Sequence, residues 1–369
     1  MKLLVTGANG FIGKNLVAQL KNEGYSEIYE YDINCTEDFL IQAIKSCDFV
    51  FHLAGINRPQ SNSEFMAGNF GFTEKLLNLL IKHNNPCPVL VTSSIQATLD
   101  NPYGVSKKAS EDAIFEYGKI SGANTFVYRL QNVFGKWCRP NYNSVVATFC
   151  NNIALDLPII ISEESKQIEL VYIDDVVKDF INKLRVLPIC KQEFCYIPVT
   201  YKVTLGKLAD TIRSFKRSRE NLSIPDMSNE LVRKLYSTYL SYLPKDEFSY
   251  YLNTNVDNRG TFTEFIRTDN KGQVSINISR PGITKGNHWH NSKTEKFLVV
   301  SGNGIIRFRK IDSTELIEYT VSSDKLEVVD IPPGYTHNIT NTGDNDMITV
   351  MWANEEFDPA NPDTYYMEV

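Results

Sequence analysis

Short apolar runs alternate with segments of helical period over the first half of the chain. Up to about residue 186, β-rich runs such as KLLVTG, DFVFHLAG and PVLVTSS alternate with amphipathic stretches such as FIGKNLVAQLKNEG and FTEKLLNLLIKHN. This alternation predicts βαβ units and an α/β domain built on a parallel sheet. Residues 205–243 continue the helical period with a break at Pro225, and we expect them to close this first domain.

The pattern changes after residue 243. From Gly260 onward, short runs of alternating polarity are separated by the turn sequences DNKG, SGNG and PPGY, and no long helical pattern follows. Regularly spaced short strands predict an all-β sandwich or small barrel. We place the boundary near residues 244–252, which gives predicted domains of residues 1–247 and 248–369.

Composition narrows the class of protein. A length of 369 residues suits two domains, and 42% hydrophobic with 22% charged residues is typical of soluble globular proteins. The net charge of −6 argues against binding to nucleic acid or to anionic lipid. The 7 cysteines form no C-x-x-C pair, and no apolar run is long enough to span a bilayer. We therefore expect a cytoplasmic protein with reduced thiols and no membrane insertion.

A glycine-rich loop follows the first predicted strand and opens the first predicted helix. Glycines at such a position let the backbone turn tightly and approach a pyrophosphate, whose charge meets the free N–H groups of the helix. The predicted contacts to a dinucleotide come from Gly7, Asn9, Gly10, Phe11, Ile12 and Gly13. Asp32 ends the second predicted strand, where its carboxylate would accept hydrogen bonds from the adenosine ribose and favour NAD over NADP.

A second group of residues indicates hydride-transfer chemistry. Tyr103 and Lys107 lie four positions apart, so on a helix they share one face, and the ammonium can lower the phenol pKa and bind the nicotinamide ribose. Ser94 ends the preceding predicted strand and can orient a substrate carbonyl. Ser93 is the alternative, because adjoining residues of a strand point to opposite faces.

Together these motifs resemble an extended short-chain dehydrogenase/reductase that acts on nucleotide sugars. The resemblance covers about residues 1–245 and includes DFVFHLAG, Asn69, RLQNVFG and VYIDDVV. It implies a Rossmann-like fold in which Ser94 binds the substrate carbonyl, Tyr103 donates a proton and Lys107 assists it. It also implies that Asn132 lies near the sugar nucleotide. Further cofactor contacts are expected from Leu53, Ala54 and Gly55.

Histidines and a glutamate form a separate cluster near the end of the chain. His288, His290 and Glu295 fit the spacing G-x5-H-x-H-x4-E-x6-G, and His337 lies in a second element, P-x-G-x2-H-x3-N. Two histidines two apart on a strand project to one side. The two elements resemble the cupin motifs, so residues 253–369 are expected to form a cupin jelly roll. Its three imidazoles and one carboxylate suit Zn²⁺, with Fe, Mn or Ni possible.

The entry sequence DNRGTFTE resembles that of the cupin 3,5-epimerases of sugar nucleotides, which use a His–Asp proton shuttle. This chain has 5 histidines, and the metal cluster leaves the predicted cupin no spare imidazole. A proton acceptor would have to be a carboxylate, lysine, tyrosine or metal-bound hydroxide. Glu264, Lys296 and Tyr335 are weak candidates for that role.

The pairing of these domains resembles the bifunctional enzymes of capsular polysaccharide synthesis. That resemblance implies C3 epimerisation of a UDP-2-acetamido-2,6-dideoxy-4-hexulose in the cupin. Reduction at C4 with NADPH would follow, giving UDP-2-acetamido-2,6-dideoxy-L-talose, a precursor of L-FucNAc. NADPH conflicts with the NAD signal at Asp32, so NADH is the second choice. The alternatives are a single-activity reductase or epimerase with a structural or sugar-binding cupin, and a non-enzymatic dinucleotide sensor. A homodimer is expected.

Overall fold

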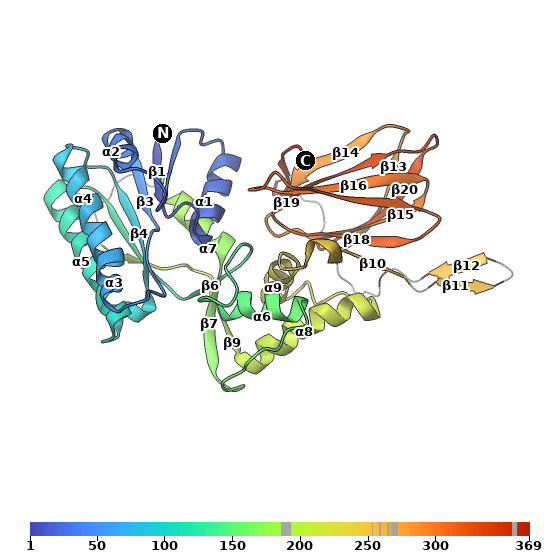
Figure 1. Ribbon diagram of the computed structural model, residues 1–369, viewed down its shortest axis with the longest axis horizontal. Coiled ribbons are helices and arrows are strands. Elements are labelled where there is room, and N and C mark those ends of the chain that lie inside the picture. The colour runs from blue at the N-terminus through green and yellow to red at the C-terminus, as the bar shows by residue number, and fades with distance from the viewer. Residues whose placement is uncertain (186–192, 253, 258–259, 264–265, 267–271, 356–359) are drawn as a thin grey trace. The chain divides into compact units, whose positions relative to one another are not determined.

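The computed structural model describes all residues except 186–192, 253, 258–259, 264–265, 267–271 and 356–359. Contacts group the chain into two compact units, one of residues 1–144 with 168–203 and the other of residues 145–167 with 204–369. The elements of both units are labelled in Figure 1.

The first unit is built on a parallel sheet, which confirms the predicted Rossmann-like fold. Its strand order is β2 (Ile28–Tyr31), β1 (Leu3–Thr6), β3 (Phe49–His52), β4 (Val89–Ser94), β5 (Thr125–Leu130) and β8 (Glu193–Cys195). Every adjacent pair in this order is parallel. The strands β1 and β3 are buried along their whole length, as expected for a sheet covered on both faces.

Helices of the first unit connect these strands and form the apolar core with them. They are α1 (Phe11–Asn22), α2 (Glu37–Ser46), α3 (Ser63–Phe65), α4 (Phe72–Lys82), α5 (Pro102–Ser121) and α7 (Ile173–Asn182). A π-helix (Met66–Gly71) joins α3 to α4, and a 3₁₀ turn (Ile95–Thr98) precedes α5. A small second sheet contains β6 (Asn132–Phe134), β7 (Gln167–Tyr172) and β9 (Tyr201–Thr204).

The second unit contains two five-stranded sheets that form its all-β part, which agrees with the predicted fold. One sheet has the order β10 (Ser249–Tyr251), β18 (Glu327–Ile331), β15 (Glu295–Ser301), β20 (Met347–Ala353) and β13 (Gln273–Ser279). The other has the order β17 (Leu316–Ser322), β16 (Asn303–Lys310), β19 (Tyr335–Asn341), β14 (Thr284–Trp289) and β21 (Tyr365–Tyr366). The strands β11 (Thr254–Asp257) and β12 (Gly260–Thr263) form a separate hairpin.

Helices and a 3₁₀ turn among the described residues complete the second unit. They are α6 (Val145–Ala154), α8 (Leu205–Asn221), α9 (Glu230–Leu240) and the 3₁₀ turn of Lys245–Glu247. Arg219 of α8 pairs with the buried Asp330 of β18 at 3.5 Å, and the Ser237 hydroxyl of α9 donates to the Ser292 carbonyl at 2.6 Å. Because of such contacts, these helices group with the β-sheets, whereas the sequence pattern attached residues 205–243 to the first domain. The boundary at residues 247 and 248 stays a prediction about separable domains.

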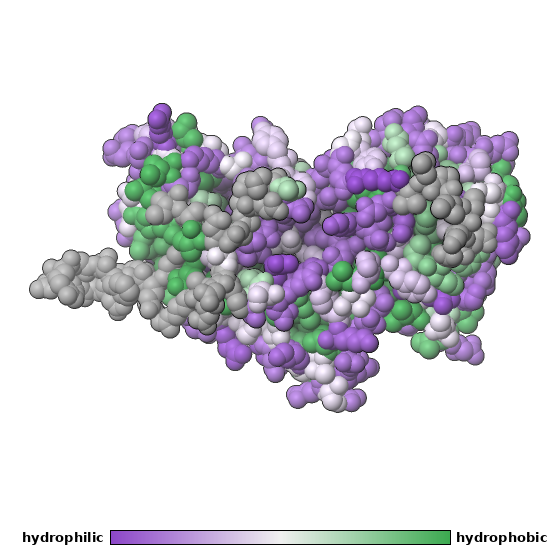
Figure 2. All heavy atoms as spheres, turned by 180° about the vertical axis from the view of Figure 1, so that it is seen from behind, coloured by the Kyte–Doolittle hydropathy of each residue, from purple (hydrophilic) through white to green (hydrophobic). Residues whose placement is uncertain are grey.

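The surface is mixed in character. Hydrophilic residues cover much of the face in Figure 2, and apolar residues gather in patches between them. In the part of the chain that the structure describes, no helix is both long and apolar enough to cross a bilayer.

Candidate functional site

The glycine-rich loop between β1 and α1 has the geometry of an anion cradle. Gly7 has a φ of +69°, and a Cβ on it would lie 2.8 Å from the Ala54 nitrogen. A Cβ on Gly13 would lie 2.1 Å from the Gly7 carbonyl oxygen. Gly10 caps α1, which begins at Phe11 and has no acidic residue in its first turn. Only glycine fits these close approaches, and the N–H groups that open α1 are free of a competing carboxylate, as a phosphate site requires.

Asp32 lies against this loop, but its carboxylate is already engaged with the backbone. It accepts hydrogen bonds from the N–H groups of Asn9 and Ile33, both at 2.8 Å. Asn9 was predicted to contact the dinucleotide, and Asp32 was predicted to bind its ribose. In this structure the Asp32 carboxylate holds the glycine-rich loop. It can favour NAD over NADP only by giving up these backbone partners when a dinucleotide binds.

A buried chain of hydrogen bonds connects the loop to the helix that follows β3. The ring of His52 lies between Thr6 and Thr73, with Nδ1 and Nε2 each 2.8 Å from a hydroxyl oxygen. The Thr73 hydroxyl donates to the Asn69 carbonyl at 2.8 Å, so it must accept from Nε2–H. Nδ1 therefore accepts from Thr6, whose oxygen accepts from the Ala54 N–H at 3.3 Å. Burial, with the nearby Lys107 charge, lowers the His52 pKa to about 3 and keeps the ring neutral.

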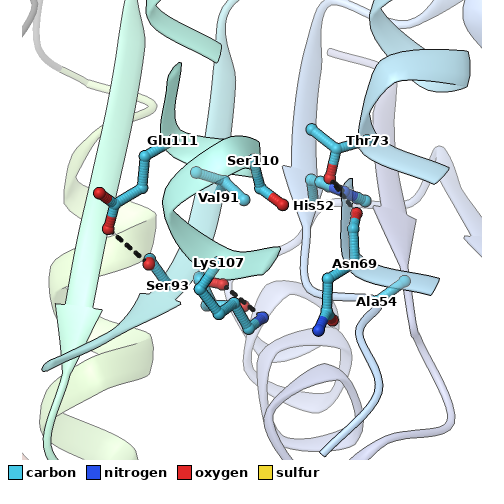
Figure 3. A pocket seen from close by; sticks show the side chains of 10 residues that line it. His52, Ala54, Asn69, Thr73, Val91, Ser93, Lys107, Ser110 and Glu111 are labelled. Atoms are coloured by element: carbon cyan, nitrogen blue, oxygen red, sulfur yellow. Dashed lines mark hydrogen bonds between the residues drawn. The ribbon is translucent and has the colours of Figure 1, made fainter. Parts of the chain in front are cut away.

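The π-helix presents Asn69 to α5, the helix that carries Tyr103 and Lys107. The Asn69 amide accepts from the Ile56 N–H at 2.9 Å and donates to the Ser106 hydroxyl at 2.9 Å. A Cβ on Gly55 would lie 2.9 Å from Asn69 Oδ1 and 3.0 Å from Lys107 Nζ. Figure 3 shows the side chains of Asn69 and Lys107 beside Ala54 at the end of β3. Gly55 thus leaves the space in which the lysine and the amide meet. Asn69 belongs to the motif that the sequence shows, whereas no sequence signal indicated the role of His52.

Helix α5 carries both predicted catalytic residues, and its start is well defined. Asn101 caps it through a hydrogen bond from the Gly104 N–H at 2.8 Å, with Pro102 at its first position. Tyr103 donates from its hydroxyl to Asn57 Oδ1 at 3.1 Å. Burial raises the Tyr103 pKa, while a hydrogen bond with Ser94 acts in the opposite direction. Lys107 was expected to lower this pKa, but here the phenol keeps its proton, which suits a proton donor.

The two adjoining serines of β4 have different partners. Ser93 is buried and donates to Glu111 Oε1 at 2.6 Å, and Arg129 binds the same carboxylate through two nitrogens, at 2.8 and 2.6 Å. Ser94 accepts from the Gln96 N–H at 3.1 Å and also contacts Tyr103. Since only Ser94 adjoins the phenol, the geometry favours Ser94 over Ser93 as the residue that orients a carbonyl.

Lys107 is buried beside Tyr103. Its ammonium donates to the Thr92 carbonyl at 3.2 Å and lies 5.9 Å from the centre of the Tyr103 ring. Burial lowers the Lys107 pKa to about 8, although the carboxylate of Glu111 acts to raise it. The amine is therefore largely protonated at neutral pH and loses its proton within the accessible alkaline range.

We expect dinucleotide affinity to weaken as the pH rises through about 8. An anionic cofactor with ribose hydroxyls favours the protonated Lys107, so its dissociation constant should rise once the free protein loses that proton. Fluorescence titration with NADPH between pH 6.5 and 9.5 measures this. The Lys107→Met variant should bind more weakly and show no inflection near pH 8. An inflection that persists in this variant would assign the titration to another group.

Asn132, the predicted substrate contact, begins β6 and is exposed. Its side-chain nitrogen donates to the Glu169 carbonyl of β7 at 3.0 Å. This bond fixes the direction of the amide and leaves its oxygen for a ligand. Its contact with a sugar nucleotide stays a prediction.

The second unit brings the four predicted metal ligands together inside its β-sheets. His288 lies on β14, with His290 just beyond it, Glu295 begins β15, and His337 lies on β19. One ligand atom from each lies within 4.8 Å of all the others. A register shift between Gly286 and His288 pairs His288 with His337 across β14 and β19. The strand irregularity thus turns the histidines of one strand toward the ligand of the next.

The donor atoms of this cluster fit a metal ion. Nε2 of His290 and of His337 lie 3.3 and 3.5 Å from Glu295 Oε2. Two atoms at about 2.1 Å from one tetrahedral Zn²⁺ lie about 3.4 Å apart. Both ring nitrogens of His337 are buried without a hydrogen-bond partner, which a metal ligand would explain. Burial lowers the His288 pKa to about 4, so that imidazole is neutral and ready to coordinate.

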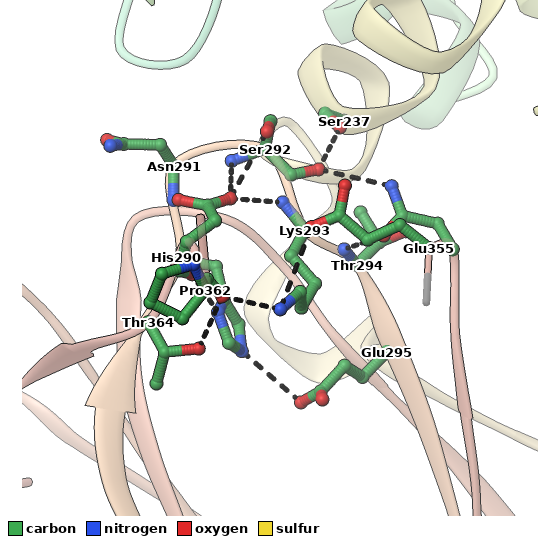
Figure 4. A network of polar contacts seen from close by, with 12 residues as sticks. Ser237, His290, Asn291, Ser292, Lys293, Thr294, Glu295, Glu355, Pro362 and Thr364 are labelled. Atoms are coloured by element: carbon green, nitrogen blue, oxygen red, sulfur yellow. Dashed lines mark hydrogen bonds and ion pairs between the residues drawn. The ribbon is translucent and has the colours of Figure 1, made fainter. Parts of the chain in front are cut away.

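The C-terminal segment holds the loop that carries His290. Oδ2 of Asp363 accepts from the N–H groups of Ser292 and Lys293, both at 2.8 Å, and Oδ1 accepts from the Asn291 N–H at 3.0 Å. His290 Nδ1 lies 2.6 Å from the Asp363 carbonyl oxygen, so it must be the protonated nitrogen. Figure 4 shows this network around His290 and Glu295. The backbone of Asp363 therefore leaves Nε2 free for a metal, a role that no sequence motif indicated.

Asp363→Ala should weaken metal binding by roughly 10- to 100-fold, the effect typical of outer partners of metal ligands. The alanine removes the carboxylate that holds the loop and frees the carbonyl that orients His290. Competition of the purified protein with a chromogenic Zn²⁺ chelator measures the affinity. Glu368→Gln, on the same segment, is the matched control and should bind like wild type. Equal affinities for wild type and Asp363→Ala would contradict this role.

The three candidates for a general base in the cupin differ in their position relative to the histidine cluster. Lys296 is buried and donates to Asp330 at 2.6 Å. Burial lowers its pKa, but the combined interactions with Asp330, Tyr236 and Tyr250 outweigh burial and raise it. Its neighbour Glu295 points to the opposite face of β15, so Lys296 is directed away from the cluster. Burial raises the Tyr335 pKa, and this residue shares a face of β19 with His337. Glu264 lies outside the described residues.

Comparison with known families finds a separate match for each part of the chain. Residues 3–185 match the NAD dependent epimerase/dehydratase family, and residues 255–365 match the polysaccharide biosynthesis C-terminal domain. A UDP-glucose 4-epimerase from Thermotoga maritima, solved with UDP-glucose, is 20% identical and covers 58% of this chain and 82% of its own, with a TM-score of 0.52. At that identity, the likeness supports the fold alone.

Two relatives match along their whole length. The UDP-2-acetamido-2,6-beta-L-arabino-hexul-4-ose reductase of Pseudomonas aeruginosa is 46% identical over 369 residues, which is 100% of this chain and 99% of the relative. The crystal structure of the capsular polysaccharide assembling protein CapF from Staphylococcus aureus is 50% identical, covers 100% of both chains and has a TM-score of 0.69. The chain therefore belongs to the CapF family, in which an extended short-chain dehydrogenase/reductase domain precedes a cupin domain.

Proposed function

We propose that this protein reduces the C4 carbonyl of a UDP-2-acetamido-2,6-dideoxy-4-hexulose with NADPH, after its cupin has epimerised C3. The product would be UDP-2-acetamido-2,6-dideoxy-L-talose, in the synthesis of a capsular polysaccharide precursor. The observation that supports the reduction is the arrangement of Ser94, Tyr103 and Lys107 beside the glycine-rich loop. The name of the Pseudomonas aeruginosa relative gives the substrate class.

The reduction assigns one task to each of three side chains. Bound NADPH supplies the hydride to C4. Ser94 orients the C4 oxygen by a hydrogen bond, and Tyr103 gives that oxygen its proton as the hydride arrives. Lys107, positively charged below about pH 8, stabilises the phenolate that Tyr103 leaves behind. Asn57 holds the Tyr103 hydroxyl before the substrate enters.

NADPH rather than NADH is proposed from the resemblance to the capsule enzymes, against the signal of Asp32. The structure supplies a reason why the two are compatible, because backbone N–H groups already bind the Asp32 carboxylate on both oxygens. A carboxylate held in this way need not face the 2′-phosphate. Comparing kcat/KM for NADPH and NADH settles the choice, and a higher value for NADH would reverse it.

Epimerisation is assigned to the cupin because its substrate is the same 4-keto sugar. The C4 carbonyl acidifies the hydrogen on C3, and a divalent cation at the histidine cluster would supply positive charge where the substrate oxygen becomes negative. CapF has been solved with the inhibitor 3-isopropenyl-tropolone. A tropolone presents adjacent carbonyl and hydroxyl oxygens, a donor pair that suits a divalent metal. His288, His290, Glu295 and His337 would hold the ion.

Hydrogen exchange with solvent tests the epimerisation separately from the reduction. The purified protein is incubated in heavy water with the UDP-4-keto-6-deoxy-HexNAc substrate and no NADPH, and deuterium at C3 and C5 is followed by NMR. We expect exchange at C3 alone. No exchange would reject the epimerase activity and leave a reductase whose cupin is structural or binds sugar. A reductase with a structural or sugar-binding cupin is the second candidate function. Two observations favour it: no further imidazole lies near the cluster in the described chain, and the Pseudomonas aeruginosa relative is named only as a reductase.

A further inference from the structure

Two arginines near the catalytic tyrosine face one aromatic ring. The guanidinium carbon of Arg58 lies 5.7 Å from the centre of the Tyr142 ring, and that of Arg139 lies 5.0 Å from it. Both arginines are exposed, and neither pairs with a carboxylate of the described residues. Two positive charges therefore contact one ring in a protein whose net charge is −6. Because no carboxylate of the described residues neutralises them, this arrangement favours the arrival of an anion.

The position of this pair relates it to the reduction. Arg58 follows Asn57, whose side chain accepts the hydrogen bond of the Tyr103 hydroxyl at 3.1 Å. The Tyr142 hydroxyl contributes to raising the Tyr103 pKa, so both phenols lie within electrostatic reach of each other. A group held by the arginines would thus lie next to whatever Tyr103 protonates.

The loop that carries Arg139 and Tyr142 is held in a specific conformation by its neighbours. Lys136, at its start, is buried and binds Asp174 at 2.9 Å. Trp137 and Asn141, which flank Arg139, have φ angles of +68° and +54°, a left-handed conformation that is costly for residues other than glycine. Such conformations persist where the surrounding structure imposes them, and they concentrate at functional sites.

We propose that Arg58 and Arg139 bind the diphosphate of the nucleotide sugar, with Tyr142 as the ring that positions both guanidinium groups. This inference rests on the proposed function and names the groups that hold the substrate. In a UDP-hexose only the pyranose ring separates the reacting C4 from the diphosphate on C1. The phosphates would therefore reach groups beside Tyr103. A guanidinium binds phosphate oxygens through two parallel N–H bonds, and contact with an aromatic face leaves those N–H groups available.

Calorimetric titration with UDP and with uridine tests the subsite without relying on turnover. Wild type should bind UDP more tightly than uridine, because only UDP carries the charge. Arg58→Gln and Arg139→Gln should each lose about tenfold in UDP affinity and the double variant about 100-fold, with uridine affinity unchanged. Arg58→Lys should recover part of the loss, since it keeps the charge without the fork. Arg217→Gln is the matched control, because Arg217 is also exposed and forms no ion pair with an acidic side chain of the described residues.

Other results would overturn the subsite. The diphosphate subsite would be refuted if the double variant bound UDP within twofold of wild type, or if it lost affinity for NADPH and kept its affinity for UDP. Equal affinities of the wild-type protein for UDP and uridine would refute the subsite as well. Failure of the proposed function looks different, because wild type would then bind UDP through these arginines and yet not oxidise NADPH with the 4-keto sugar.

Discussion

Tyr103→Phe should lower kcat/KM for NADPH oxidation with the 4-keto sugar by about 10²- to 10⁴-fold, the range that a positioned general acid contributes. The phenylalanine keeps the ring that packs edge-on against Phe65 at 5.5 Å and removes only the hydroxyl. That hydroxyl contacts Asn57 and Ser94 and is the group placed to protonate the C4 oxygen. Fold and NADPH affinity should change little, because the loop and the His52 chain stay intact.

The informative control is the exchange of the C3 hydrogen in heavy water. This exchange should persist in Tyr103→Phe at the wild-type rate, because the proposed epimerisation uses the cupin alone. Asn57→Ala should keep most of the reductase activity, since Asn57 holds the hydroxyl only before substrate arrives. Loss of both reduction and exchange in Tyr103→Phe would mean that one site performs both steps, and the proposed division of labour would be wrong.

The arrangements that could be predicted from the sequence are those that depend on local spacing. A glycine-rich loop between a strand and a helix needs only adjacent residues to be recognised, and Gly7 and Gly13 occupy the contacts that only glycine permits. The same holds for Tyr103 and Lys107, which share a face of α5 because they are one helical turn apart. The cluster of three histidines and Glu295 depends on contacts over a longer range, and it was predicted because its two motifs have fixed spacing on neighbouring strands.

The residues that sequence reasoning missed depend on contacts between distant segments. His52 is tied to Thr6 and Thr73 through buried hydrogen bonds, and nothing in its immediate sequence indicates them. Asp363 lies 73 residues from His290, which its carbonyl orients. The attachment of α8 to the cupin arises in the same way, through the pair of Arg219 and Asp330. Periodicity along the chain contains no information about such pairs, so the three-dimensional fold was needed to find them.

His337→Ala should abolish specific metal binding and, with it, C3 exchange. Neither ring nitrogen of His337 has a hydrogen-bond partner in the structure, as expected for a metal ligand. Replacing it by alanine removes one of the four ligands and leaves no donor in its place. The loss of affinity should exceed the roughly 10- to 100-fold expected for outer partners such as Asp363. A metal at about 1,000 times its dissociation constant stabilises the folded state by about 4.1 kcal/mol. Thermal unfolding should therefore shift upward with added Zn²⁺ in wild type and not in this variant.

Two further proteins separate metal loss from misfolding. His337→Gln fills more of the space than alanine and should behave like it toward metal, while His83→Ala, a histidine outside the cluster, should retain the wild-type metal content. NADPH oxidation with an already epimerised substrate should persist in all of them, because Ser94, Tyr103 and Lys107 belong to the first unit. If His337→Ala loses metal yet exchanges C3 at the wild-type rate, the ion has a structural role and the proton transfer belongs to side chains of the cupin.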